Sequence, residues 1–359
     1  MIKANKLKVG DKVAIVSLSS GILGEPFIKH ELDLGIKRLE EFGLIPVFME
    51  NSLKGIDFIK NHPEKRAEDL KHAFADNEIK AIFCAIGGED AYLSLPHLLN
   101  DEDFKNTVKN NPKIFLGFSD STTNHLMLNK LGLITFYGQA FLTDLAEFEP
   151  DMLEYSKTAF DYLFQAPENY EVKPSPVWYL DRTDYSPNAV GTLREKRDNS
   201  KGYEVLKGTE KVSGKLLGGC IDILADYAFI ETENYPVFEE IAHKYNMLPT
   251  LEEWKNAIML IETGPAKISP EKYRNIIKKF KDIGIMNQIS GIVCGKPVDE
   301  VYYEEYKQVL AEELAEFNFP IFYNLNIGHA YPHAILPLGG EIELDPKSKT
   351  ITIKNSALN

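Results

Sequence analysis

The chain has 359 residues, of which 44% are apolar and 26% charged, and its formal net charge at pH 7 is −14. A chain of this length usually folds into two domains, and this composition excludes a disordered or fibrous protein. The excess of 54 acidic over 40 basic side chains disfavours nucleic acid and anionic membrane surfaces as partners. Small molecules or peptides are therefore the expected partners.

The N-terminal residues 1–21 combine lysines with a short apolar run that charged residues interrupt. This pattern indicates neither a signal peptide nor a membrane span, so we expect a cytoplasmic protein. The cysteines, Cys84, Cys220 and Cys294, are three in number and far apart. That spacing argues against a disulfide framework and against a zinc cluster.

Strand-like apolar runs alternate with helical periods over residues 1–140. The expected strands cover residues 13–18, 44–49, 81–86, 113–118 and 133–137, and helices are expected from Phe27 to Phe42 and after Pro63. This alternation is typical of a parallel sheet covered by helices. Ligands of such sheets bind beyond the carboxyl ends of the strands, where Gly87, Gly88 and Ser119 stand.

The stretch from Glu147 to Lys211 is rich in prolines and turns and has no sustained helical or strand period. We expect an interdomain segment here, either a loop that covers a site or a plain surface crossover. The predicted organisation is an N-terminal α/β domain over residues 1–165, a linker and covering loop over 166–210, and a C-terminal domain over 211–359.

The C-terminal residues return to regular patterns. Strands are expected at 257–264, 289–295 and 320–329, helices from Ser269 to Ile283 and over 302–317, and a hairpin at 341–353. The chain is therefore predicted to be of the α/β class, with an N-terminal parallel-sheet domain that carries a nucleophile elbow and a smaller mixed α/β C-terminal domain.

Residues 113–124, KIFLGFSDSTTN, predict an apolar strand that bends at Ser119 into a polar helix start. A tight strand-to-helix turn exposes a serine hydroxyl and directs the N–H groups of the helix start toward it. The match to the G-x-S-x-G elbow is partial, because Ser121 replaces the second glycine. Ser119 is thus a candidate nucleophile, and a buried or helix-capping serine is the alternative.

A serine nucleophile needs a base and a group that orients the base. His329 ends an apolar strand behind Gly328, and Glu262 ends the strand AIMLIETG, where an acid is otherwise costly to bury. The alternatives are a histidine that ties down a turn and a solvated strand end. His333, four residues after His329, has metal-ligand spacing only on a helix, and Pro332 argues against a helix and hence against a metal site.

Donors for a tetrahedral oxyanion are available at two places. One is the amide of Asp120, directly after the candidate nucleophile, and the other is the Gly87-Gly88 turn, where missing side chains allow close approach. Gly88 and Asp120 are the predicted oxyanion donors. A glycine pair also suits a phosphate turn, but G-x-G-x-x-G and a Walker lysine are both missing, so no nucleotide cofactor is expected.

Together these segments resemble the LD-carboxypeptidase family of serine peptidases, which also includes the microcin C immunity proteins. The resemblance rests on the order and spacing of KVGDKVAIVSLSS, AIGGED, FLGFSDSTTNH, GLITFYGQA, GKLLGG, LIETG and NIGHAYPHAILPLGG. It implies a site between two domains, with Ser119 as nucleophile, Glu262 as orienting acid and His329 as general base. It also implies a homodimer that hydrolyses, without metal, an amide at the end of a peptide.

The substrate implied by the resemblance is a murein tetrapeptide, cut at its L,D bond, or a peptidyl or aminoacyl nucleotide in the immunity branch. The GGED and SDSTTNH segments look closer to that branch, while Cys220 stands where the family pattern has Asn. Gly87, Glu89 and Trp178 are the predicted substrate-binding residues, with Trp178 either stacking on a substrate base or packing in the fold. A non-catalytic small-molecule binding protein is the alternative from another class.

Overall fold

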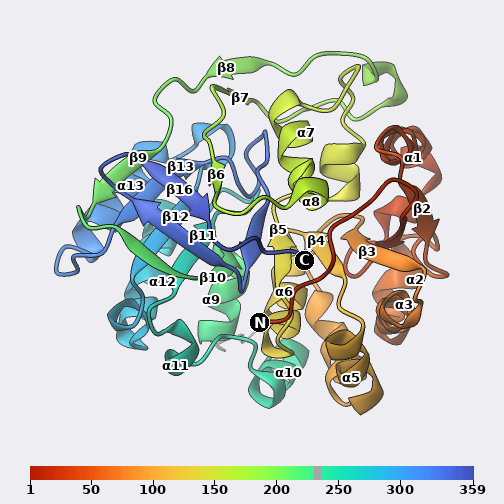
Figure 1. Ribbon diagram of the computed structural model, residues 1–359, viewed down its shortest axis with the longest axis horizontal. Coiled ribbons are helices and arrows are strands. Elements are labelled where there is room, and N and C mark those ends of the chain that lie inside the picture. Colours follow the sequence, from red (N-terminus) through yellow and green to blue (C-terminus); the bar gives the residue numbers. More distant parts are fainter. Residues whose placement is uncertain (230–235) are drawn as a thin grey trace.

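The computed structural model describes residues 1–229 and 236–359, and two β-sheets organise it (Figure 1). The N-terminal sheet has the strand order β14-β5-β4-β3-β1-β2. Its strands are β1 (Lys12–Val16), β2 (Ile45–Phe48), β3 (Ile79–Cys84), β4 (Ile114–Gly117), β5 (Thr135–Tyr137) and β14 (Leu336–Leu338). From β2 to β5 neighbouring strands are parallel, which confirms the predicted parallel-sheet half.

The edge strand β14 comes from the far end of the chain. Leu336 pairs with Tyr137 and Leu338 with Thr135, antiparallel to β5. The C-terminal part of the chain therefore supplies an edge strand of the N-terminal sheet. The termini also meet, since the Asn359 N–H donates to the Ala4 carbonyl at 2.9 Å.

The C-terminal sheet has the order β6-β16-β15-β10-β11-β12-β13-β9. Its strands are β6 (Tyr170–Val172), β9 (Glu204–Lys207), β10 (Val212–Cys220), β11 (Ile258–Glu262), β12 (Gly291–Gly295), β13 (Ile321–Leu325), β15 (Glu341–Asp345) and β16 (Thr350–Ile353). The central strands β10 to β13 are parallel and the outer pairings are antiparallel. This confirms the mixed α/β C-terminal part that the sequence predicted, and β6 and β9 add to its sheet from the segment 166–210.

The segment 166–210 differs from its expectation, because it contains short strands. β6 pairs with β16 and β9 with β13, while β7 (Val177–Tyr179) and β8 (Lys196–Asp198) form a ribbon of their own. Each of these strands is three or four residues long. Strands of that length show too few alternations to be recognised, and distant partners decide their pairing.

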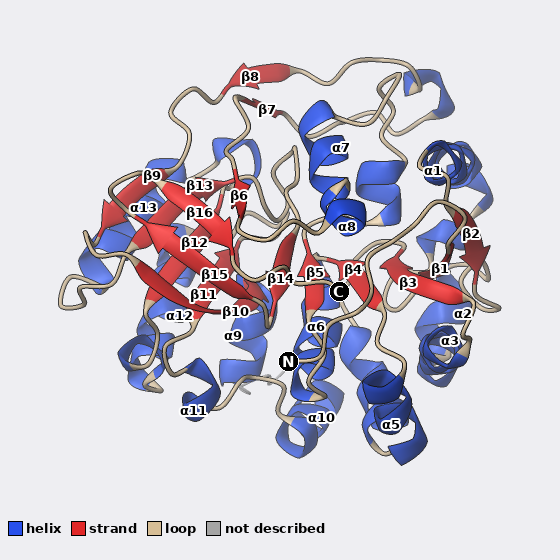
Figure 2. Cartoon of the chain, in the orientation of Figure 1, coloured by secondary structure: helices blue, strands red, loops and turns tan. Residues whose placement is uncertain are grey.

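Helices cover both faces of the sheets (Figure 2). They are α1 (Lys29–Glu41), α2 (Ile56–Asn61), α3 (Pro63–Ala75), α4 (Leu95–Leu99), α5 (Glu102–Asn110), α6 (Thr122–Lys130), α7 (Glu154–Phe160), α8 (Tyr162–Gln165), α9 (Ile221–Phe229), α10 (Pro236–Tyr245), α11 (Leu251–Trp254), α12 (Pro270–Asp282) and α13 (Tyr303–Glu313). In Figure 2, α5, α6, α9 and α10 lie on one side of the sheets and α7 and α8 on the other.

Helix α12 illustrates how local sequence and packing agree. The Ser269 side chain accepts the Lys272 N–H at 3.1 Å, and Pro270 occupies the first turn, where it removes no helical hydrogen bond. Its buried residues are Tyr273, Ile276, Ile277 and Phe280. This spacing of three and four places one apolar stripe on the sheet.

The apolar core runs through both halves. One buried cluster contains Val16 and Leu126 of the N-terminal half together with Ile221 and Ile276 of the C-terminal half. Because apolar side chains are buried jointly across the junction, the two sheets are held in a definite relation to each other. That relation is what brings residues from both halves into one site.

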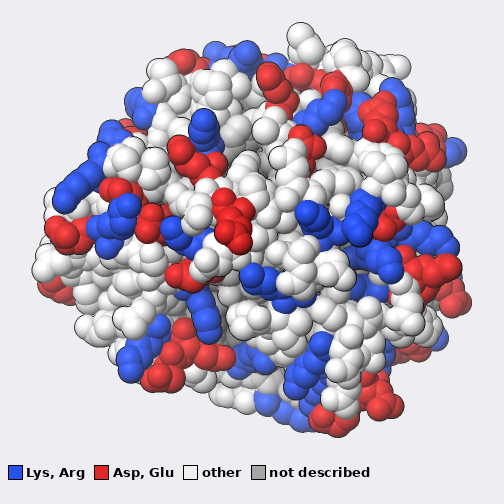
Figure 3. Space-filling view, in the orientation of Figure 1, with Lys and Arg blue, Asp and Glu red and all other residues white. Residues whose placement is uncertain are grey.

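The surface drawn in Figure 3 carries acidic and basic side chains intermixed over both halves. In the part of the chain that the structure describes, no helix combines the length and apolar character needed to span a bilayer.

Candidate active site

Ser119 stands where β4 turns toward α6. Its φ angle is +62°, a left-handed conformation that is uncommon for residues with a Cβ atom, and it begins a short 3₁₀ turn that α6 follows at Thr122. Such a conformation persists only where the surroundings hold it. Here the Ser119 N–H donates to Tyr137 Oη at 3.1 Å, and the Ser121 N–H donates to the Phe118 carbonyl at 3.2 Å.

Three side chains from three strand ends meet at this turn. Ser119 Oγ lies 2.9 Å from Nε2 of His329, and Nδ1 of the same ring lies 2.8 Å from Oε2 of Glu262. Ser119 follows a strand of the N-terminal sheet, whereas Glu262 ends β11 and His329 follows β13 of the C-terminal sheet. The structure thus brings the three predicted catalytic residues into one line of hydrogen bonds across the junction of the sheets.

The Glu262 side chain is fully buried, and two glycines make room for it. A Cβ atom on Gly295 would lie 2.8 Å from the Glu262 Cβ, and one on Gly328 would collide with the Glu262 carboxylate. Burial alone would raise the pKa of Glu262. The charge of His329 and the hydrogen bonds from His329 and Tyr137 outweigh burial, so that the pKa lies below its ordinary value and the carboxylate is ionised.

The turn after β3 lies against the candidate nucleophile. A Cβ atom on Gly87 would stand 2.8 Å from the Ser119 Cβ and 3.3 Å from the Asp120 amide nitrogen. Gly88 has a φ angle of +155°, and a Cβ atom there would collide with the Ser19 hydroxyl. Only glycine therefore allows this loop to pass so close to Ser119, which places the predicted oxyanion donors, Gly88 and Asp120, on two neighbouring segments.

Sequence reasoning missed the side chains that hold this turn. The buried Asp120 carboxylate accepts the Ser19 hydroxyl at 2.5 Å and the Ala91 N–H at 2.9 Å. The fully buried Arg66 binds Asp90 through both terminal nitrogens, at 2.6 and 3.1 Å. Ser19, Asp90 and Asp120 all lie in motifs that carried the family resemblance, and their polar character next to buried strands was the available signal.

The remaining predicted substrate-binding residues lie in different surroundings. Glu89 is exposed on the glycine turn. Trp178 is buried, with 5% of its surface accessible, and the Lys296 ammonium lies 4.9 Å from its ring centre. The neighbouring Tyr179 N–H donates to the Tyr331 carbonyl at 3.1 Å, so β7 is attached to the loop that carries His329.

A buried ion cluster attaches the segment between β7 and β8 to Glu147. Glu147 accepts the Arg194 Nε at 2.6 Å and Arg182 Nη2 at 2.9 Å. The Arg194 guanidinium also stacks on the ring of Tyr331, 3.7 Å from its centre. Burial raises the pKa of Glu147, but the two guanidinium groups outweigh it and hold that pKa below its ordinary value. This segment therefore packs on the loop that carries His329.

A second histidine–carboxylate pair lies beside the first. His333 Nδ1 is 2.9 Å from Oδ1 of Asp144, and both side chains are buried. The Phe118 ring contacts both histidines, with centroid distances of 5.1 Å to His329 and 5.3 Å to His333. The His333 N–H also donates to Ser156 Oγ at 2.9 Å. These contacts attach the His329 loop to the N-terminal half.

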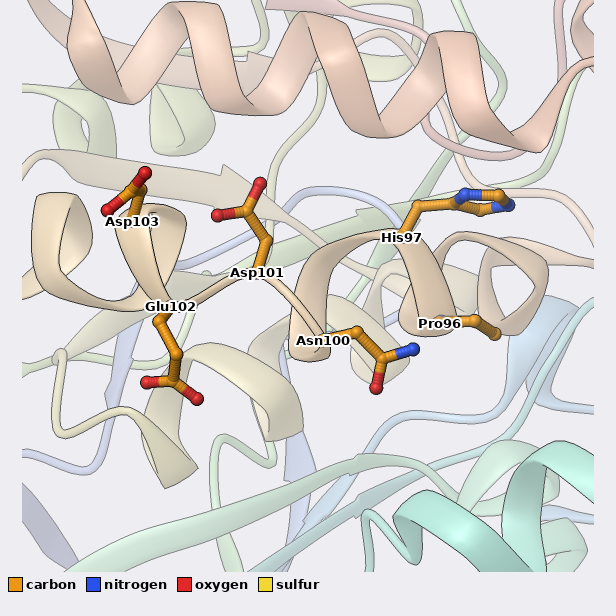
Figure 4. Close-up of a pocket in the computed structure, with 6 residues that line it drawn as sticks. All are labelled: Pro96, His97, Asn100, Asp101, Glu102 and Asp103. Atoms are coloured by element: carbon orange, nitrogen blue, oxygen red, sulfur yellow. The ribbon is translucent and has the colours of Figure 1, made fainter.

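A shallow hollow of about 550 Å³ lies at the α4–α5 connection (Figure 4). The residues that line it are Pro96, His97, Asn100, Asp101, Glu102 and Asp103. Its central carboxylate is already engaged, because Asp101 caps α5 through the Phe104 N–H and pairs with Lys71. Within residues 1–229 and 236–359, no group of three or more His, Cys, Asp or Glu side chains is arranged to hold a metal ion.

The sequence matches two family models, the LD-carboxypeptidase N-terminal domain over residues 13–138 and the LD-carboxypeptidase C-terminal domain over residues 213–344. The chain belongs to the LD-carboxypeptidase family. All three residues of the Ser119–His329–Glu262 line fall within the matched ranges, whereas β6, β9 and β16 of the C-terminal sheet lie outside them. Membership in this family makes the protein a serine-peptidase-like hydrolase.

The relatives that this chain resembles are named either as carboxypeptidases or as microcin immunity (MccF) or MccF-like proteins. A solved structure of an MccF-like protein from Streptococcus pneumoniae in complex with AMP is 46% identical, covers 96% of this chain and 98% of that one, and has a TM-score of 0.89. The "Probable murein peptide carboxypeptidase" of Bacillus subtilis (strain 168) is 25% identical over 98% of this chain and 94% of its own. The Microcin C7 self-immunity protein MccF of Escherichia coli is 25% identical over 99% of this chain and 96% of its own.

Proposed function

We propose that this protein is a serine carboxypeptidase-type hydrolase in which Ser119, His329 and Glu262 form the catalytic triad. The observation that carries the proposal is the hydrogen-bonded line from Ser119 Oγ through His329 to the buried Glu262 carboxylate, with distances of 2.9 and 2.8 Å. In such a line the base takes the serine proton and the acid stabilises the imidazolium that forms. The bond that breaks is an amide at the end of a small peptide.

The first step follows from this geometry. His329 Nε2 removes the proton from Ser119 Oγ as the oxygen attacks the substrate carbonyl carbon, and the ionised Glu262 stabilises the protonated ring. The N–H groups of Gly88 and Asp120 donate to the oxyanion of the tetrahedral intermediate. His329 then returns the proton to the leaving nitrogen, which leaves an acyl group on Ser119.

Water completes the reaction by the reverse sequence of proton transfers. His329 removes a proton from water as the water oxygen attacks the acyl carbon, and the protonated His329 returns that proton to Ser119 Oγ as the tetrahedral intermediate collapses. No metal is required in either step, since the carbonyl is polarised by backbone amides. The products are a carboxylic acid and an amine.

The substrate class that we propose is an amino acid or peptide joined to a nucleotide. One observation supports this branch over a muropeptide: the 46% identical MccF-like relative has been solved in complex with AMP. The relatives named as a murein peptide carboxypeptidase and as a Microcin C7 self-immunity protein are both 25% identical and favour neither branch. The buried Trp178 next to the His329 loop is the candidate for packing on the base. A muropeptide remains the second candidate, because the curated murein relative aligns over 98% of the chain.

Replacement of the nucleophile tests the reaction. We expect Ser119→Ala to lower kcat by about 10⁶-fold, with an unchanged urea midpoint. The matched control is Ser121→Ala, which removes a hydroxyl two residues further along the same turn and should retain turnover. A Ser119→Ala protein that keeps full turnover would contradict the triad assignment.

Two further measurements test the substrate class and the presence of a reactive serine independently of each other. Turnover of an aminoacyl-sulfamoyl adenylate is compared with release of D-alanine from a murein tetrapeptide, and we expect kcat/KM to favour the adenylate. Covalent labelling of Ser119 by a fluorophosphonate is measured in parallel. Preference for the tetrapeptide would reassign the substrate, whereas a failure of the reagent to label Ser119 would favour a binding protein without catalysis.

A further inference from the structure

Tyr137 occupies the centre of the junction between the two sheets. It ends β5 in the N-terminal sheet, its side chain is buried, and its hydroxyl lies 2.6 Å from Oε1 of Glu262 in the C-terminal sheet. The same hydroxyl lies 3.1 Å from the Ser119 amide nitrogen and 3.5 Å from Thr122 Oγ1. One phenol oxygen therefore contacts both the acid and the backbone of the nucleophile.

The direction of these hydrogen bonds follows from the groups involved. The Ser119 N–H can only donate and an ionised carboxylate can only accept, so the single phenol proton belongs to the bond with Glu262. Burial and the nearby charge of Glu262 raise the pKa of Tyr137 well above its ordinary value, which keeps that proton on the oxygen. Tyr137 thus accepts from Ser119 and donates to Glu262.

We propose that Tyr137 is a positioning residue of the reaction, because its hydroxyl fixes the Glu262 carboxylate to the strained backbone of Ser119. The inference rests on the proposed function and adds a residue to it. Glu262 then has one oxygen held by Tyr137 and the other by His329. Ser119, with its φ angle of +62°, is held at its N–H by the same hydroxyl.

This arrangement has a consequence for the oxyanion site. The Ser119 N–H is already bound to Tyr137, so it does not contribute to binding the substrate oxygen. The donors must come from the next residue and from the glycine turn, which are the amides of Asp120 and Gly88.

A hydrogen bond between Cys220 and Thr122 crosses the same junction. It allows the effect of removing the Tyr137 hydroxyl to be compared with that of removing a more distant hydroxyl. The Cys220 N–H at the end of β10 donates to Thr122 Oγ1 at 3.0 Å, and Thr122 lies within 3.5 Å of the Tyr137 hydroxyl. Thr122 is thus one contact further from the acid than Tyr137. Its removal should affect catalysis less, since the contact between the two hydroxyls is long.

The decisive variant is Tyr137→Phe, which keeps the ring and removes only the hydroxyl. We expect kcat to fall by about 10- to 100-fold with KM within about twofold of the wild type, because the variant misplaces the catalytic groups and leaves substrate contacts in place. A structural role alone would lower only the fraction of folded enzyme, so kcat divided by the fraction of Ser119 that a fluorophosphonate labels would stay at the wild-type value. Thr122→Val should lower kcat by less than Tyr137→Phe does.

The pH profile provides an independent measurement. The titratable groups around the Glu262 carboxylate are His329, Tyr137, Cys220 and His333. Burial raises the pKa of the Cys220 thiol, so it stays neutral, and His333 keeps its partner Asp144 in the variant. Without the phenol proton the carboxylate charge acts more strongly on the imidazolium of His329. The acid limb of kcat/KM should therefore move to higher pH.

Two further variants test whether the effect is specific to the Tyr137 hydroxyl. Tyr203→Phe removes another buried phenol, which donates to the Val172 carbonyl at 2.9 Å, and should leave kcat and the acid limb unchanged. If Tyr137→Phe does not fold, 3-fluorotyrosine at position 137 retains the shape and makes the phenol a stronger donor, so the acid limb should move to lower pH.

The outcomes separate this inference from the proposed function. An inactive Ser119→Ala together with a Tyr137→Phe enzyme of wild-type kcat and pH profile would overturn the role of Tyr137 alone. A fully active Ser119→Ala enzyme would overturn the triad, and with it the role of Tyr137.

Discussion

Two histidines that are four residues apart, His329 and His333, each bind a carboxylate through one ring nitrogen. They differ in the surroundings of the other ring nitrogen. His329 is bound to Glu262 at 2.8 Å, and its other nitrogen lies 2.9 Å from Ser119 Oγ. His333 is bound to Asp144 at 2.9 Å, and its Nε2 is buried without a hydrogen-bond partner among the described residues. The accessible fraction is 12% for the His329 side chain and 0% for that of His333.

A histidine in contact with a buried acid occurs twice here, and of the two only His329 also contacts a serine hydroxyl. What distinguishes His329 is a serine on a strained turn beside it and a partly open face through which a substrate carbonyl can approach. His333 instead links the loop that carries His329 to the N-terminal half, through Asp144 and Ser156. We therefore propose that the His329–Glu262 pair takes part in the chemistry and that the His333–Asp144 pair supports the loop.

The largest expected effect distinguishes the two histidines directly. His329→Ala should lower kcat by about 10⁶-fold, since the base is lost, and it should also lower the free energy of unfolding, because the buried Glu262 carboxylate loses its ring partner. Steady-state kinetics and urea denaturation of the same preparation measure both quantities. A His329→Ala enzyme with near-normal kcat would remove the distinction between the pairs.

The next effect concerns the acid of the first pair. Glu262→Gln should lower kcat by about 10⁴-fold, because the neutral amide neither stabilises the imidazolium nor selects the required tautomer. Asp144→Asn is the matched change in the second pair, and kcat should remain much closer to the wild type.

The stability of the Glu262 site should also depend on pH, with a sign set by its lowered pKa. A carboxylate with a depressed pKa stabilises the fold above its ordinary value of 4.5, and this contribution is lost as pH falls through the pKa of the folded state. The difference in unfolding free energy between wild type and Glu262→Gln should therefore shrink below pH 4.5. A difference that grows toward acid pH would contradict this assignment.

The smallest expected effect on catalysis concerns His333. His333→Asn leaves the Asp144 carboxylate buried without its ring partner, which should cost about 3 kcal/mol of unfolding free energy while kcat stays within about tenfold. Urea denaturation followed by circular dichroism measures the loss. A catalytic defect as large as that of His329→Ala, without loss of stability, would show that His333 takes part in the chemistry.

Local sequence patterns were sufficient to predict much of this fold. The alternation of apolar strands and helical periods predicted the parallel strands β1 to β5, and Ser269 with Pro270 predicted where α12 begins. These features depend on neighbours in sequence, so a pattern of a few residues carries them. The strand-to-helix bend at Ser119 was predictable for the same reason.

Other elements depended on partners far away in the chain. Strands β6 to β9 are too short to show a period, and β14 adds to a sheet that begins more than 300 residues earlier because Leu336–Leu338 fits beside β5. Such pairing is decided by the surface that the rest of the fold presents. The pairing therefore cannot be predicted from the sequence of the strand alone.

The sequence by itself determined which groups this protein has available for chemistry: a serine at a bend, an acid and a histidine at strand ends, and a glycine pair after β3. Only the tertiary structure decided that Ser119, His329 and Glu262 lie within hydrogen-bond distance of one another, and that Tyr137 joins the nucleophile to Glu262. The physical reason is that hydrogen bonds form over about 3 Å, whereas these residues are separated by long stretches of chain. Burial of a common core across the two sheets brings them to that distance.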